Sequence, residues 1–170
     1  TIEFEVMLHK LHNGYHLPSV VGITVDGSGN KVYGTGTPFR IGDADFSAVQ
    51  FPIFPNFAVS MPKDTGYSAL TSADKSKEDR VLRGVTDCSQ CHGDPDGAGP
   101  LLPPDAGTAI WSEPNKRVCG SCHDDLDYTK PYVSNGATMP ANTTEAMCTT
   151  CHQATALANI IAAVQRAQTS

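Results

Sequence analysis

Six cysteines and the histidines that follow them are the residues of this sequence best suited to redox chemistry. They form Cys-x-x-Cys-His three times, at residues 88–92, 119–123 and 148–152. Two thiols three positions apart on one helical turn can each add to a vinyl group of one porphyrin, and the next histidine can bind its iron. The pattern therefore predicts three c-type haems. The predicted attachment residues are Cys88, Cys91, Cys119, Cys122, Cys148 and Cys151, and the predicted proximal ligands are His92, His123 and His152.

Other uses of paired cysteines fit the pattern less well. Disulfides do not require a histidine after every pair, and a bridge over three residues is strained. Structural zinc sites take histidines further along the chain. Thioredoxin-like chemistry uses one pair within a strand–helix unit, whereas this chain has three pairs in loop-rich sequence. Haem attachment is the interpretation we favour.

The three remaining histidines, His9, His12 and His16, lie in one N-terminal segment. Three haem irons have six axial positions, and the chain has six histidines. We therefore predict bis-histidine ligation of every iron, which leaves no open site. Met139, in Gly-Ala-Thr-Met-Pro at 136–140, is a rival ligand that would raise the potential of its haem. It lies between the second and third attachment sites, and packing against a porphyrin is the role we favour for it.

The distal histidines need elements that can aim them. Residues 4–12 are expected to form a short helix, which the following Asn-Gly pair ends. His9 and His12 would then lie about one turn apart on one face, within reach of two neighbouring haems. His16 lies beyond the turn and can approach a third. The apolar alternation over residues 2–6 leaves a short strand as the alternative.

The rest of the chain gives weaker signals. Residues 20–25 and 31–33 around a Gly-rich turn predict a β-hairpin. The Pro-rich residues 38–62 predict extended chain. The polar residues 63–83 predict either an exposed loop or a short helix around 75–82. Four apolar residues at helical spacing predict an amphipathic terminal helix, namely Leu157, Ile160, Ile161 and Val164.

The spacing of the attachment sites indicates the fold class. The motifs begin at Cys88, Cys119 and Cys148, so each haem has about thirty residues of chain, too few for a separate core. We predict a mostly irregular fold with short helices and a small β-hairpin, organised around three covalently bound haems. It would be a single trihaem domain, 1–170. Its parts would be an N-terminal segment with the distal histidines (1–19), a hairpin and extended region (20–62) and the haem-attachment region (84–170).

Composition excludes several classes of partner. The 170 residues carry a formal charge of −6, which argues against binding to nucleic acid or anionic lipid. No apolar run is long enough to span a membrane. The first residue is Thr1, as expected of an exported protein whose signal has been cleaved.

Three short stretches resemble a known family. His-Lys-Leu-His-Asn-Gly at 9–14, Val-Tyr-Gly at 32–34 and Asp-Phe-Ser-Ala-Val-Gln-Phe-Pro at 45–52 resemble the outer-surface decahaem cytochromes of metal-reducing bacteria. The resemblance implies bis-histidine haems, export, and transfer of respiratory electrons to minerals, soluble shuttles or partner cytochromes. It implies that His9 and His12 are distal ligands, whereas His16 rests on counting alone. This chain has three attachment motifs, not ten.

We therefore expect electron transfer without catalysis, in an extracellular or cell-surface location with the periplasm as the alternative. Expected partners are other cytochromes or extracellular electron acceptors, and self-association into a conductive filament, because residues 38–62 and the terminal helix suit subunit contacts. Two alternatives stay open. One is a soluble periplasmic shuttle, and the other is a multihaem reductase in which one haem keeps an open axial position.

Overall fold

The computed structural model describes the chain in segments: residues 3–50, 63–84, 89–92, 115–134, 137–142 and 144. They fall into two compact units, the first holding residues 3–50 and 63–84 and those described between 117 and 142. The second holds 89–92, 115–116 and 144. The third attachment motif, the predicted terminal helix and residues 51–62 lie outside the described residues. The single trihaem domain stays a prediction.

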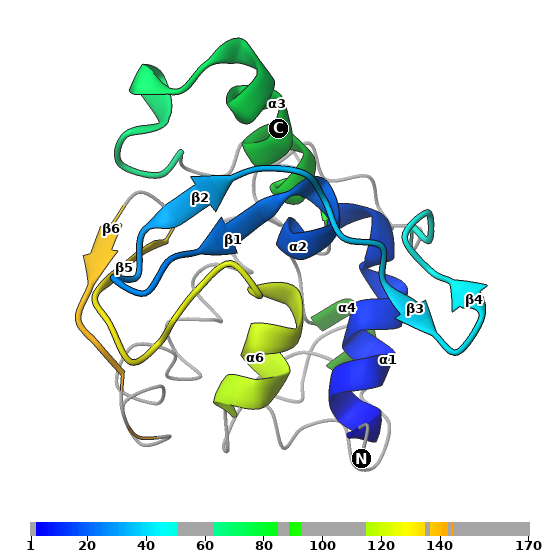
Figure 1. Cartoon of the computed structure of the whole chain (residues 1–170). Helices are drawn as coiled ribbons and strands as arrows, with labels where there is room; N and C mark the ends of the chain where they lie inside the picture. The colour runs from blue at the N-terminus through cyan, green and yellow to red at the C-terminus, as the bar shows by residue number, and fades with distance from the viewer. Residues whose placement is uncertain are drawn as a thin grey trace, which may run out of the picture. The chain divides into compact units, whose positions relative to one another are not determined.

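The described residues form short helices and three two-stranded antiparallel sheets (Figure 1). The helices are α1 (Phe4–His12), α2 (Pro18–Val21), α3 (Ser72–Val81), α4 (Ser89–His92) and α6 (Lys116–Cys122), with 3-10 helices η1 (Gly14–His16) and η2 (Tyr67–Ala69). The strands are β1 (Ile23–Val25), β2 (Lys31–Tyr33), β3 (Arg40–Ile41), β4 (Ala44–Asp45), β5 (Tyr132–Ser134) and β6 (Ala137–Met139). A mostly irregular chain with short helices and small sheets agrees with that part of the predicted fold class, whereas its organisation around three haems stays a prediction.

Helix α1 has the bounds predicted from the sequence, and the strand alternative is wrong from Phe4 onward. Its acidic Glu5 lies in the first turn and its basic residues in the last, which suits the helix dipole. After α1 the chain turns at once into η1. A side chain at Gly14 would bring its Cβ within 2.0 Å of the Phe46 carbonyl oxygen, so only glycine fits this close approach.

The hairpin prediction is confirmed over residues 23–33. Strands β1 and β2 pair with Ile23 opposite Tyr33 and Val25 opposite Lys31. In the connecting turn the Asp26 carboxylate accepts hydrogen bonds from the backbone N–H groups of Ser28 and Asn30, at 2.8 and 2.9 Å. These bonds hold the turn and lower the pKa of Asp26.

Two sequence predictions about neighbouring segments need correction. Residues 20 and 21 belong to α2 and not to the hairpin, because Pro18 starts a helix that Gly22, in the left-handed region at φ 98°, ends. Within the region predicted as extended, residues 40–45 form the β3–β4 hairpin around Gly42, whose φ is 58°. The predicted helix at 75–82 is α3, which begins earlier because the Thr71 hydroxyl caps it by accepting from the Asp74 N–H.

The apolar core of the described residues is small. Its buried side chains are Leu17, Pro18, Val21 and Ile23, which run from the end of η1 into β1. Several polar side chains are also buried, namely Asn13, His16, Glu78, Ser121, Asp125 and Asn142. A core of this size contributes little to folding, so the buried polar contacts must position much of the first unit.

Candidate functional site

The second attachment motif is the one that the structure describes completely. Cys119 and Cys122 lie three residues apart on α6, about 60° apart around the helix axis, and neither forms a disulfide. The His123 N–H donates to the Cys119 carbonyl at 3.0 Å, so the histidine continues the same turn. The His123 side chain is exposed, and the residue lies directly after the end of α6. Two reduced thiols on one turn with a histidine directly after them suit covalent haem attachment.

The other two motifs are described in part or not at all. Cys91 is exposed and His92 partly buried, both on α4, while Cys88 lies outside the described residues. Cys148, Cys151 and His152 lie outside them too. The structure therefore places the second motif within the first unit, together with the N-terminal histidines.

In each of the three N-terminal histidines, Nδ1 forms a hydrogen bond with a backbone carbonyl oxygen. The distance is 2.7 Å from His9 to Glu5, 2.9 Å from His12 to Leu8 and 2.6 Å from His16 to Arg80. A carbonyl oxygen only accepts, so Nδ1 must carry the proton in each ring. In a neutral imidazole the lone pair then lies on Nε2, the arrangement typical of metal-ligating histidines.

His16 is the most enclosed of the three. Its ring is buried, lies edge-on to Tyr15 with centroids 5.0 Å apart, and contacts the side chain of Gln50. The guanidinium group of Arg80 stacks on the same Tyr15 ring, with its Cζ 3.7 Å from the ring centroid. Burial, helped by the charges of Arg80 and Arg83, lowers the pKa of His16, although the bond to the Arg80 carbonyl raises it. The neutral ring is the form that binds metal.

Asp124 joins the second motif to the histidine-bearing helix. Its Oδ2 lies 2.6 Å from Lys10 Nζ and accepts from the Ser19 hydroxyl at 2.6 Å, while Oδ1 accepts from the Ser19 N–H at 2.9 Å. Lys10 lies between His9 and His12 in α1, and Asp124 directly follows His123. One carboxylate thus ties the predicted proximal-ligand segment to the predicted distal-ligand segment.

A second ion pair joins the other ends of the same two segments. Arg117 Nη1 lies 2.6 Å from Glu3 Oε1, both on exposed side chains. The two pairs are seven residues apart on each segment, Glu3 to Lys10 and Arg117 to Asp124, so α1 and α6 run in the same direction (Figure 1). Next to this arrangement the Cys122 thiol contacts the Asn13 side chain, and burial raises its pKa.

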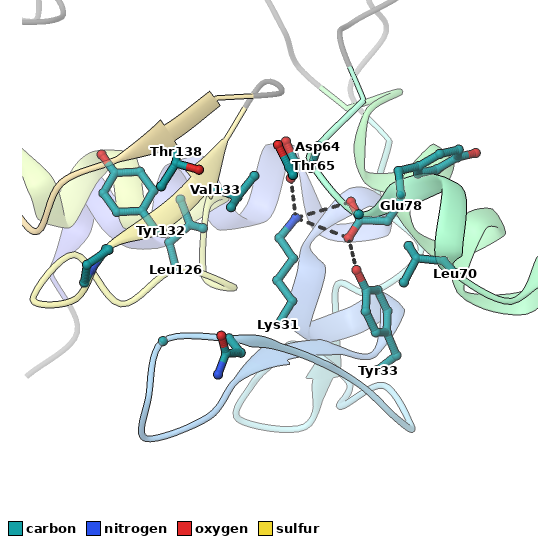
Figure 2. Close-up of a pocket in the computed structure, with 15 residues that line it drawn as sticks. Lys31, Tyr33, Asp64, Thr65, Leu70, Glu78, Leu126, Tyr132, Val133 and Thr138 are labelled. Atoms are coloured by element: carbon teal, nitrogen blue, oxygen red, sulfur yellow. Dashed lines mark hydrogen bonds and ion pairs between the residues drawn. The ribbon is translucent and has the colours of Figure 1, made fainter.

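A charged cluster that the sequence analysis missed lies in a cavity of about 390 Å³ beside β2. Figure 2 shows Lys31 pointing toward Asp64 and Glu78, with the Tyr33 hydroxyl on the same glutamate. Lys31 Nζ lies 2.8 Å from Asp64 and 3.2 Å from both Glu78 and Asp125. Although burial opposes it, the charges of these carboxylates raise the pKa of Lys31. Burial and Glu78 raise the pKa of Tyr33 as well.

The positive charge at the centre of this cluster is the Lys31 ammonium group. Among the residues that the structure describes, no group of three or more His, Cys, Asp or Glu side chains is arranged to hold a metal ion. The partners of Lys31 lie 33 to 94 residues away in sequence, on segments that carry no shared motif, and no sequence signal could have identified them.

Met139, the rival ligand, lies on β6 opposite Tyr132 and is partly buried.

Comparisons with known proteins give one match. The family model described as outer membrane cytochrome MtrC/MtrF-like, domains II/IV, matches residues 1–164. No curated protein and no solved structure matches the chain. Over the described part of the chain, no helix has the length and apolar character needed to cross a membrane.

Proposed function

The chain belongs to the outer membrane cytochromes described as MtrC/MtrF-like, domains II/IV, and on this basis we propose that it transfers electrons through three bis-histidine c-type haems. This family of cytochromes transfers electrons, which fits a protein that is not an enzyme, and its outer-membrane setting suggests an extracellular or cell-surface location. When bound, haem supplies reversible one-electron chemistry at its iron. The chain's own residues attach, ligate and orient it.

The proposed roles follow the three motifs and the N-terminal segment. Cys88, Cys91, Cys119, Cys122, Cys148 and Cys151 attach the haems, His92, His123 and His152 are proximal ligands, and His9, His12 and His16 are distal ligands. The observation that carries the proposal is the shared Nδ1–H to carbonyl bond of the three N-terminal histidines. It fixes the tautomer in which Nε2 can donate its lone pair to iron.

Two further features fit haem. The second motif offers two reduced thiols one turn apart with a histidine after them. The first unit has only four buried apolar side chains among its described residues, which suits a protein whose cofactors complete the interior. Covalent haem attachment needs reduced thiols, and a small apolar core leaves the interior to be completed by the haems.

The partners we propose are other cytochromes or extracellular electron acceptors, which follow from the family. Self-association into a filament stays a prediction from sequence, because it rests on the Pro-rich residues 38–62 and the terminal helix, of which 51–62 and the helix lie outside the described residues. Negative-stain microscopy of the native protein separates a filament from a discrete shuttle.

The haem count tests the proposal. We expect intact-protein mass and pyridine haemochrome spectra of the exported protein to give three haems per chain. Replacing both thiols of the second motif, Cys119→Ala with Cys122→Ala, should leave two. Gln90→Ala, inside the first motif but away from its thiols, should retain three. A colourless protein, or one that binds zinc in place of haem, would contradict the proposal.

A second candidate function has one observation in its favour. The His16 ring is enclosed by the Arg80 carbonyl, Gln50 and Tyr15, so it could serve the fold and not an iron. One haem would then keep an open axial position, as in a multihaem reductase. In that case the reduced native protein binds carbon monoxide at one haem, and His16→Ala leaves that stoichiometry unchanged. If His16 is a ligand, the native protein binds no carbon monoxide and only the His16→Ala variant binds it.

A further inference from the structure

We infer that His9, and not His12 or His16, is the distal ligand of the haem attached at Cys119 and Cys122. The inference rests on the proposed function, because it assumes that this motif carries a haem. It goes further by pairing one distal histidine with one attachment site. The argument depends on which side of α1 is held against the second motif.

The side of α1 that contacts the second motif is marked by two residues. Lys10 binds Asp124, the residue after the proximal His123, at 2.6 Å. Asn13, at the C-terminal end of α1, contacts the Cys122 thiol. The first contact involves the residue that follows the motif, and the second involves a cysteine of the motif itself. The surface between Lys10 and Asn13 therefore faces the second attachment site.

His9 lies next to this surface and His12 does not. At about 100° per residue, His9 lies about 40° from Asn13 and about 100° from Lys10 around the helix axis. His12 lies about 100° from Asn13 and about 160° from Lys10. Of the two, His9 is the one that can approach a haem at the second motif without rotation of α1.

The surroundings of His12 support its assignment to a different haem. His12 lies about 40° from Leu8 around the axis, and Phe4 extends the same side by one more turn. Leu8 is 38% exposed and Phe4 68% exposed, so this side of α1 is apolar and uncovered. An apolar strip next to a ligand histidine suits the face of a porphyrin, and this strip points away from Lys10 and Asp124.

His16 is held in another direction. Its Nδ1 is bound to the Arg80 carbonyl, and its Cβ lies 3.0 Å from the position that a Cβ on Gly84 would take. His16 is thus held against the segment that follows α3, which suits a haem other than the second.

The test counts haems that bind carbon monoxide in two backgrounds. In the reduced full chain, His9→Ala and His12→Ala should each create one such haem. In the chain that lacks the second haem, Cys119→Ala with Cys122→Ala, His9→Ala should create none, whereas His12→Ala should still create one. His12→Ala is thus the matched control, and a haem count of two by mass confirms that the background protein folded and matured.

The results separate this inference from the proposed function. If His12→Ala is silent in the two-haem background and His9→Ala is not, the pairing is wrong. If His9→Ala creates no binding site in the full chain, His9 is not a ligand and the proposed bis-histidine set fails. Should the two-haem protein not accumulate, Asp124→Ala in the full chain should alter the low-spin ferric resonance that His9→Ala removes. An effect on the resonance that His12→Ala removes would overturn the pairing.

Discussion

Asp124 accepts a charged hydrogen bond from Lys10 over 2.6 Å, although 114 residues separate them. The lysine lies between two predicted distal ligands and the aspartate follows a predicted proximal one. Both aspartate oxygens are used, because Ser19 donates to each of them. The contact therefore holds together the two segments that carry these predicted ligands.

Removing this carboxylate should destabilise the protein. We expect Asp124→Ala to lower the free energy of unfolding by about 2–4 kcal/mol, because it leaves the partly buried Lys10 ammonium and the Ser19 donors without their acceptor. Guanidinium unfolding followed by haem absorbance measures the change. Arg117→Ala is the matched control, since its pair with Glu3 has side chains 69% and 48% exposed and should contribute less than about 1 kcal/mol. Equal losses in the two variants would contradict the role given to the contact of Asp124 with Lys10 and Ser19.

The turn between His12 and His16 should not tolerate a side chain. A Cβ at Gly14 would lie 2.0 Å from the Phe46 carbonyl oxygen, so Gly14→Ala should cost about 2 kcal/mol or more through displaced backbone. Gly27→Ala is the control, because no atom lies within 4 Å of its Cβ position, and the change should stay within about 1 kcal/mol. Thermal unfolding compares the two. A stable Gly14→Ala protein would show that η1 does not dock as described.

The charge at Lys31 should matter more than that of exposed lysines. Lys31→Met removes the ammonium group that Asp64, Glu78 and Asp125 share, and we expect a loss of about 3–5 kcal/mol at pH 7. Lys63→Met is the control, since the pair of Lys63 with Asp79 is more exposed and should contribute less than about 1 kcal/mol.

The pH dependence of this loss follows from the raised pKa of Lys31. A lysine with a raised pKa in the folded state stabilises fully below its unfolded value of about 10.4, and this stabilisation is lost only as pH rises through the folded value. The difference between the native protein and Lys31→Met should therefore be the same at pH 7 and pH 9. A difference that shrinks by pH 9 would mean that the ammonium is not held as described.

Local signals in the sequence were enough to predict α1 and the β1–β2 hairpin. Charged residues suit the ends of α1, and a turn rich in glycine and aspartate lies between two apolar runs. The start of α2 was missed although Pro18 and Gly22 mark its ends, because the apolar residues 20–25 read as one strand. Local pattern alone cannot decide between a helix and a strand over so few residues.

The sequence indicates candidate ligands for the site but not the contacts that position them. Cysteine and histidine spacing is a chemical requirement of haem attachment and can be read directly. Asp124 with Lys10, and Lys31 with its carboxylates, depend on contacts between segments 33 to 114 residues apart. Aspartates and lysines are common on any surface, so the sequence contains no mark that separates these from solvated charges.

Bis-histidine ligation at every iron is the central claim, and low-temperature electron paramagnetic resonance of the ferric protein tests it most directly. With three haems per chain confirmed by mass, we predict that all of the ferric spin is low-spin and that the reduced protein binds no carbon monoxide. A high-spin ferric signal equivalent to one haem per chain, with carbon monoxide bound in the same proportion, would contradict the claim.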